Sequence, residues 1–145
     1  MLILLQLYKV EKVLICDPDT LFRSNLKYVL ESNGFVVQEA SRSSEAVKHV
    51  LWEGFDAILF NMQAADSNGV QIFSVLKTID YKLPVIIVTD HDVTLSSVSS
   101  IIHESFRLFQ KPVGHKEIVE AVQDAVLAKA NCKWFVKVLA TRGIN

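Results

Sequence analysis

The sequence is poor in the residues that build disulfide scaffolds and long membrane spans. Its 145 residues include only 2 cysteines, 3 prolines and 5 glycines. Cys16 and Cys132 match no metal-binding or redox spacing, so we expect a reducing compartment, the cytoplasm. The apolar run at residues 2–7 is too short to cross a bilayer and lacks the basic start and cleavage site of a signal peptide.

Neither sign of charge dominates the chain. It has 15 basic and 16 acidic residues and a formal net charge of -1. This balance argues against nucleic acid or an acidic membrane surface as a partner. Half of the residues are hydrophobic and the mean hydropathy is +0.29, which excludes a mainly disordered chain. The length suits a single domain.

Five short runs rich in β-branched and aromatic residues recur along the chain. Four of them are continuously apolar, which is typical of strands buried on both faces of a parallel sheet. The gaps between the runs are long enough for one helix each. The five expected strands are residues 13–16, 35–37, 57–60, 85–88 and 106–109.

Apolar residues at helical spacing fill those gaps, so a strand and a helix alternate five times. Right-handed crossovers then give a doubly wound α/β domain with helices on both faces of the sheet. The expected buried stripes are Leu21, Leu26, Val29 and Leu30; Ala46, Val47, Val50 and Leu51; Val70, Phe73, Leu76 and Ile79; Val98, Ile101 and Ile102; and Ile118, Val122, Ala125 and Val126.

Polar residues follow most of the expected strands. Asp17 follows the first strand, and Asn61 follows the third. Thr89 and Asp90 follow the fourth, and Lys111 comes after the fifth. In a doubly wound sheet the ligand site lies beyond the carboxyl ends of the strands, so these side chains are expected to share one small polar crevice.

Five segments in this order resemble the receiver domain of two-component response regulators. The resemblance implies a flavodoxin-like (βα)5 fold with a five-stranded parallel sheet in the order 2-1-3-4-5, and a cis peptide at Lys111–Pro112. In that family an aspartate after the third strand takes a phosphoryl group from a histidine kinase, with Mg²⁺ bound nearby. The segments are residues 13–19 (VLICDPD), 56–61 (DAILFN), 68–69 (NG), 84–89 (PVIIVT) and 111–112 (KP).

Three positions depart from the family pattern. Asn61 stands at the phosphoacceptor position, and a carboxamide cannot form an acyl phosphate in the usual way. Pro18 replaces the second residue of the family's acidic pair and removes a metal ligand. Leu108 stands where the family often carries a switching Tyr or Phe. We interpret the chain as an atypical receiver, a pseudo-receiver, and not as an enzyme.

The charge of the crevice supports this interpretation. In the family three carboxylates and one lysine sum to about -2, which attracts a divalent cation. Here Asp17 and Lys111 sum to zero, and Asp90 brings the total only to -1. We therefore expect no cofactor and weak or absent Mg²⁺ binding, with Lys111 paired to Asp17, Asp90 or the Asn61 amide oxygen.

Other roles for these residues remain open at this stage. Asp17 and Pro18 also suit the cap and first turn of a helix. Phosphorylation on another carboxylate (Asp19, Asp66 or Asp90) is one alternative function. Binding of a small anion between Thr89, Lys111 and the Asn61 amide is another.

The expected organisation is an N-terminal extension (1–10), a receiver-like domain (11–128) and a C-terminal extension (129–145) that continues the last helix or adds another. The resemblance implies a partner-binding face formed by the fourth helix, which we expect near residues 93–100, with the fifth strand and helix. The C-terminal extension either packs on its own domain or forms a homodimer contact. We therefore expect protein partners in a signalling pathway. The apolar residues that suggest an interface in the extension are Trp134, Phe135, Val138 and Leu139.

Overall fold

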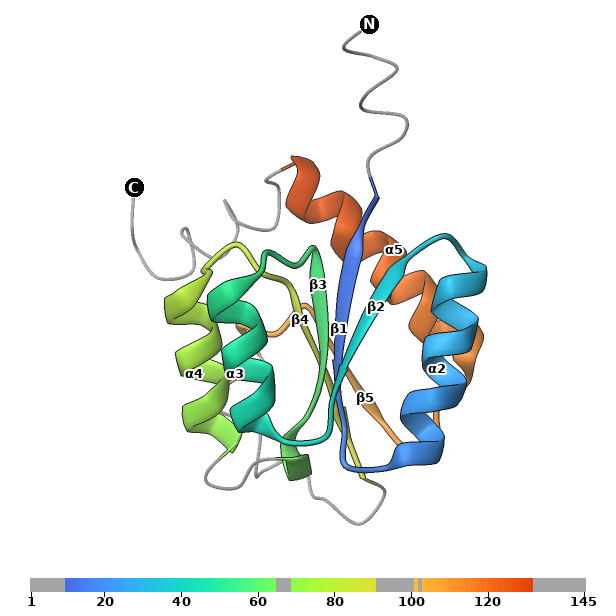
Figure 1. Cartoon of the computed structure of the whole chain (residues 1–145), viewed down its shortest axis with the longest axis horizontal. Helices are drawn as coiled ribbons and strands as arrows, with labels where there is room; N and C mark the ends of the chain where they lie inside the picture. The colour runs from blue at the N-terminus through green and yellow to red at the C-terminus, as the bar shows by residue number, and fades with distance from the viewer. Residues whose placement is uncertain (1–9, 65–68, 91–100, 102, 132–145) are drawn as a thin grey trace, which may run out of the picture.

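The computed structural model describes residues 10–64, 69–90, 101 and 103–131. A five-stranded parallel sheet forms its centre, with the strand order β2-β1-β3-β4-β5 (Figure 1). This confirms the predicted fold class and strand order. The strands are β1 (Lys12–Cys16), β2 (Val36–Ala40), β3 (Ala57–Asn61), β4 (Val85–Thr89) and β5 (Arg107–Gln110).

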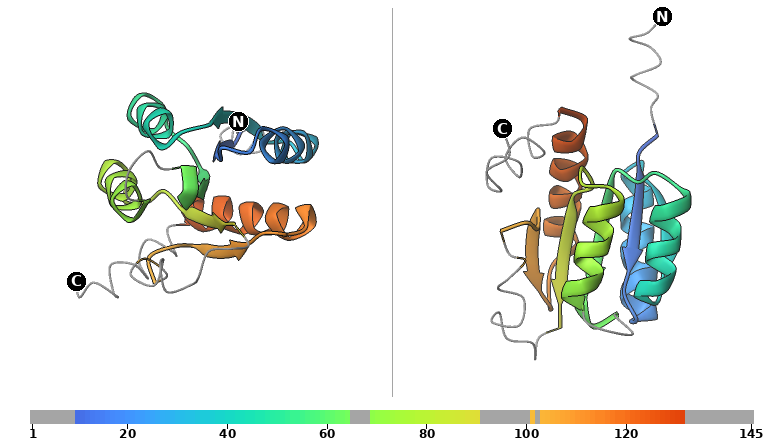
Figure 2. Two further views of the ribbon diagram at one scale, coloured as in Figure 1. Left: turned by 90° about the horizontal axis from the view of Figure 1, so that it is seen from below. Right: turned by 90° about the vertical axis from the view of Figure 1, so that its left-hand side faces the viewer.

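Helices cover both faces of the sheet. One face carries α3 and α4, and the other carries α2 and α5 (Figure 2). The predicted helix near residues 93–100 lies outside the described residues. The helices are α2 (Thr20–Ser32), α3 (Ser43–Trp52), α4 (Gly69–Ile79) and α5 (His115–Asn131), with a short 3-10 turn η1 (Met62–Ala64) after β3.

Two hydrophobic cores result, one on each face of the sheet. Alternate residues of one strand point to opposite faces, so Leu14 packs under α3 and α4 while Val13 and Ile15 pack under α2 and α5. Every residue of β3 and β4 is buried. Their continuous apolar runs are therefore the strands of the sheet centre, as such runs predict.

Two leucines of the predicted stripes are exposed, so that part of the prediction was wrong. Leu21 of α2 and Leu51 of α3 lie on the surface, while Leu26, Leu30 and Val50 are buried. Leu51 directly follows Val50, and one residue turns a helix by about 100°. A stripe that includes both neighbours is wider than the face that meets the sheet.

No helix among the described residues is long and apolar enough to cross a membrane.

The strands all run from the upper to the lower edge of the sheet in Figure 1. The carboxyl-terminal ends of the strands thus lie at the lower edge, and their amino-terminal ends, where the chain enters each strand, lie at the upper edge. These two edges differ sharply in chemistry.

Candidate functional site

The carboxyl-terminal edge of the sheet brings together the four residues predicted for the pocket. Asp17 follows β1, Asn61 and Thr89 end β3 and β4, and Lys111 follows β5. Asp17, Asn61 and Thr89 are each 1% exposed. Because the strands are parallel and adjacent, residues far apart in sequence converge there.

Asp17 is the centre of this site. Its Oδ2 accepts a hydrogen bond from Asn61 Nδ2 at 3.0 Å and pairs with Lys111 Nζ at 2.9 Å. Its Oδ1 accepts from the backbone N–H of Asp19 at 2.8 Å. Both oxygens of this buried carboxylate are therefore satisfied by the protein, as a buried charge requires.

Asp17 does not cap the following helix, so the capping role considered for Asp17 and Pro18 was wrong. The cap is Asp19, whose side chain accepts from the N–H of Phe22 at 3.1 Å. The Asp17 side chain instead turns back to accept the Asp19 N–H and closes a tight turn around Pro18. The carboxylate is thereby aimed into the crevice.

Asn61 uses its whole carboxamide within the protein. Nδ2 donates to Asp17 Oδ2 and also to Asp90 Oδ1, the latter at 3.2 Å. The amide oxygen accepts from the backbone N–H of Gln63 at 2.8 Å. An aspartate at this position would lack both donors and would face two carboxylates. The asparagine thus matches its surroundings.

Lys111 lies between the two carboxylates. Its Nζ is 2.9 Å from Asp17 Oδ2 and 3.6 Å from Asp90 Oδ1. The ammonium also lies 3.9 Å from the centre of the Phe22 ring, a cation–π contact. Of the partners left open by the sequence, the structure selects the two carboxylates, since the Asn61 oxygen accepts from Gln63 instead.

Thr89 turns away from this network. Its hydroxyl donates to the backbone oxygen of Phe109 in β5, at 3.4 Å. The next residue of the loop, Asp90, is held twice: its side chain faces Asn61 and Lys111, and its N–H donates to Gln63 Oε1 at 3.2 Å. The end of β4 is thus fastened to both β3 and β5.

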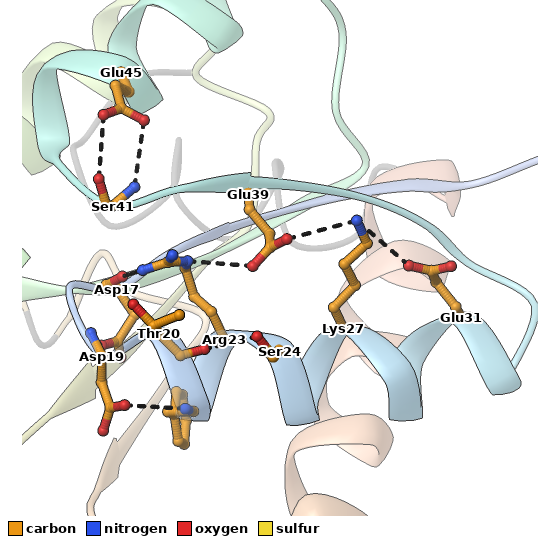
Figure 3. Close-up of polar contacts among 11 residues, drawn as sticks. Asp17, Asp19, Thr20, Arg23, Ser24, Lys27, Glu31, Glu39, Ser41 and Glu45 are labelled. Atoms are coloured by element: carbon orange, nitrogen blue, oxygen red, sulfur yellow. Dashed lines mark hydrogen bonds and ion pairs between the residues drawn. The ribbon is translucent and has the colours of Figure 1, made fainter.

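Two residues that hold the site do not stand out in the sequence. Arg23 of α2 donates to the backbone oxygen of Asp17 at 2.6 Å and to Glu39 at 3.2 Å, which links β1 to β2 (Figure 3). Gln63 joins Asn61 to Asp90. The available signals were weak: Arg23 lies in the first turns of a helix that follows a site strand, and Gln63 lies two residues after Asn61.

This set of donors fits a hard divalent cation such as Mg²⁺ poorly. Pro18 has no ligating side chain, and the Asn61 oxygen already accepts a hydrogen bond. The Asp17 oxygen that faces the crevice is paired with an ammonium group. Within the part of the chain that the structure describes, no three His, Cys, Asp or Glu side chains are grouped to hold a metal ion.

The other predicted positions are distributed as follows. The Lys111–Pro112 peptide is cis. Leu108 is partly buried in β5 and packs against the core under α3 and α4. Helix α5 extends to Asn131. The interface residues predicted in the C-terminal extension lie outside the described residues: Trp134, Phe135, Val138 and Leu139.

With this geometry established, comparison with known proteins decides the family. The model of the response regulator receiver domain matches residues 13–123. The chain belongs to this receiver-domain family. A receiver domain is generally a non-enzymatic signalling module, and membership places the chain in two-component signalling.

The curated relatives of this receiver domain are longer regulators. The chain is 25% identical over 119 residues to the transcriptional regulatory protein GlrR of Escherichia coli K12, covering 82% of the chain and 27% of that protein. It is 29% identical over 121 residues to the transcriptional regulatory protein LytR of Staphylococcus aureus N315, covering 82% of the chain and 48% of LytR. The chain thus spans less than half the length of each.

Solved receiver domains share the fold. A CheY-like receiver domain from Methanospirillum hungatei JF-1 superposes with a TM-score of 0.79 at 21% identity, covering 85% of this chain and 98% of that one. A receiver domain from Clostridium thermocellum gives a TM-score of 0.76 at 25% identity, covering 85% and 99%.

Proposed function

We propose that this receiver domain signals through protein–protein contact and is not phosphorylated at position 61. The observation that carries the proposal is the closed network around Asn61. Its amide group binds Asp17 and Asp90, and Lys111 lies between those two carboxylates. No carboxylate nucleophile stands at the end of β3 in this arrangement.

The position of Asp90 also opposes phosphorylation of the pocket. Its carboxylate lies within 3.2 Å of Asn61 Nδ2 and 3.6 Å of Lys111 Nζ, beside the position that an incoming phosphoryl group would need. An oxyanion there would meet a negative charge at short range. The same contacts oppose the alternative of a small-anion sensor, because Lys111 and the Asn61 amide are already engaged by the protein's own anions.

In this proposal the domain is held in one conformation. Binding of a partner protein, rather than phosphorylation, controls its signalling. Weak or absent Mg²⁺ binding is part of this proposal. So are protein partners of a signalling pathway. A homodimer remains a prediction, as does the cytoplasmic location.

The decisive test is intact mass after incubation with Mg²⁺ and acetyl phosphate. The control is the full chain with Asn61→Asp and Pro18→Asp, which restores the acceptor and the missing acid. We expect no phosphoryl adduct on the natural protein and an adduct on the control.

A base-labile adduct on the natural protein would overturn the proposal. Peptide mapping would then locate the acceptor among the alternatives. Asp90 lies beside Lys111, Asp19 caps α2, and Asp66 lies outside the described residues.

A further inference from the structure

Several apolar side chains are exposed at the amino-terminal edge of the sheet, opposite the pocket. They lie at or just before the starts of β2 and β1, at the end of α3, and in the turn before β4. Trp52, at the end of α3, is 85% exposed. We call this surface the entry patch; its members are Val10, Val36, Leu51, Trp52 and Tyr81.

Polar contacts hold the segments that carry the entry patch close together. The N–H of Val36 donates to the Glu11 oxygen at 2.9 Å, which joins β2 to β1. Lys12 pairs with Glu53, the residue after Trp52, at 3.3 Å, which joins β1 to the end of α3. Neighbouring strands are about 4.8 Å apart, so four entries span roughly 15 Å.

The end of α5 is fastened to the same edge. Lys129 donates to the backbone oxygen of Phe55, just before β3, and pairs with Asp80, just before Tyr81, at 3.1 Å. Asn131, the last residue of α5, lies two residues further on. The end of α5, which residues 132–145 follow in the sequence, therefore lies close to the turn that carries Tyr81.

The composition of residues 132–145 complements this surface. The segment contains Trp134, Phe135, Val138 and Leu139, with three basic residues and no acidic one. The partly exposed carboxylates of Glu53 and Asp80 lie beside the patch, where each pairs with a lysine of the domain. Fourteen residues reach about 45 Å when extended and about 20 Å as a helix, enough to cross the patch in either form.

We propose that the entry patch is an intramolecular docking surface and that its occupant is the segment 132–145 of the same chain. Large exposed apolar patches mark interaction sites, and an aromatic segment that follows the end of α5 fits the apolar surface of this one. Residues 1–9 precede Val10 of the patch in the sequence and carry a single charged residue, Lys9, against three in residues 132–145. This proposal is independent of the phosphorylation state.

Tryptophan fluorescence of the full chain tests the docking. In the Trp134→Phe background Trp52 is the only tryptophan, so its emission and its quenching by acrylamide report on the patch. We expect blue-shifted, protected emission, despite the exposure of Trp52 on the described domain. Adding Phe135→Asp with Leu139→Asp should shift the emission to longer wavelength and raise the quenching constant.

Two matched controls separate docking from unfolding. Thr141→Asp with Asn145→Asp adds the same charge at polar positions of the segment and should leave Trp52 protected. Leu21→Trp in the Trp52→Phe, Trp134→Phe background places the reporter near the opposite edge. Its emission should not respond to the Phe135→Asp, Leu139→Asp pair, and circular dichroism should remain unchanged.

Three outcomes would overturn the proposal. Trp52 could be fully solvated in the chain with the unmodified segment, which would leave the patch open. Its protection could fall on dilution, which would make the occupant a second copy. Its protection could survive the changes at Phe135 and Leu139 but disappear with Leu4→Asp and Leu5→Asp, which would assign the patch to residues 1–9.

Discussion

The two edges of the sheet differ in which side chains they bury and which they expose. At the carboxyl-terminal edge, the polar side chains of Asp17, Asn61 and Thr89 are buried, and each has a partner within the protein. At the amino-terminal edge, large apolar side chains are exposed while the nearby charges form surface pairs. The first edge has little left to offer a ligand, and the second has apolar surface to cover.

The carboxyl-terminal edge is polar because of a few side chains placed on the shared scaffold. Asn61 supplies two donors to carboxylates that the fold brings together. The scaffold, with its parallel strands and cis Lys111–Pro112 peptide, is unchanged. The network at this edge depends on a few side chains at strand ends, whereas the fold depends on the two cores.

The largest expected effect concerns restored phosphorylation. Asn61→Asp alone should remain unphosphorylated by acetyl phosphate and Mg²⁺, because it places a third carboxylate beside Asp17 and Asp90 while Pro18 still supplies no metal ligand. The further change Pro18→Asp should produce the adduct. Intact mass measures both proteins, and robust phosphorylation of the single variant would show that Pro18 matters less than we argue.

The next effect is on stability. Lys111→Met should lower the free energy of unfolding by about 3 kcal/mol, because it leaves the buried Asp17 carboxylate without its cation. Urea denaturation measures this loss. Lys27→Met is the matched control, since Lys27 forms only exposed pairs with Glu31 and Glu39, and its removal should cost less than about 1 kcal/mol.

A smaller effect should follow from removing the carboxylate of Asp90. In the Asn61→Asp, Pro18→Asp background, Asp90→Ala should speed phosphorylation by about tenfold, since a negative charge beside the incoming group is lost. The Asp90 side chain is 35% exposed, so solvent screening keeps the effect moderate. Asp90→Asn, which keeps the size of the side chain, should give a similar rate; an unchanged rate in both would contradict the role assigned to Asp90.

The smallest effect belongs to the amino-terminal edge. Lys129→Met removes the pair with Asp80 and the hydrogen bond to Phe55, both partly exposed, and should cost about 1 kcal/mol of unfolding free energy. Thermal or urea unfolding measures it. A loss as large as that for Lys111→Met would mean that the two edges do not differ in the way described.

The sequence predicts the fold well because burial leaves a regular pattern. β3 ends at Asn61 and β4 ends at Thr89, one residue after the apolar run in each strand. An apolar pattern stops at the first polar residue, whereas the hydrogen bonds between strands continue through it. β2 extends to Ala40 beyond the predicted residues 35–37, because the partly buried Gln38 and Glu39 break the apolar pattern.

The candidate site was only partly predictable. Spacing and strand ends identified Asp17, Asn61, Thr89 and Lys111, because topology alone brings strand ends together. Side-chain direction is set by local turns instead, so the pattern did not reveal that Asp19 caps the helix or that Thr89 faces β5. Likewise, the two contacts of Gln63 depend on a single turn after β3.

If the pocket is closed by its own charges, it takes no phosphoryl group. The most direct measurement is the NMR spectrum of the natural full chain before and after addition of Mg²⁺ and beryllofluoride, a phosphoryl analogue. We predict unchanged amide signals for Gln63, Thr89 and Lys111, with clear shifts in the Asn61→Asp, Pro18→Asp protein. Saturable shifts of these signals in the natural chain would contradict the account.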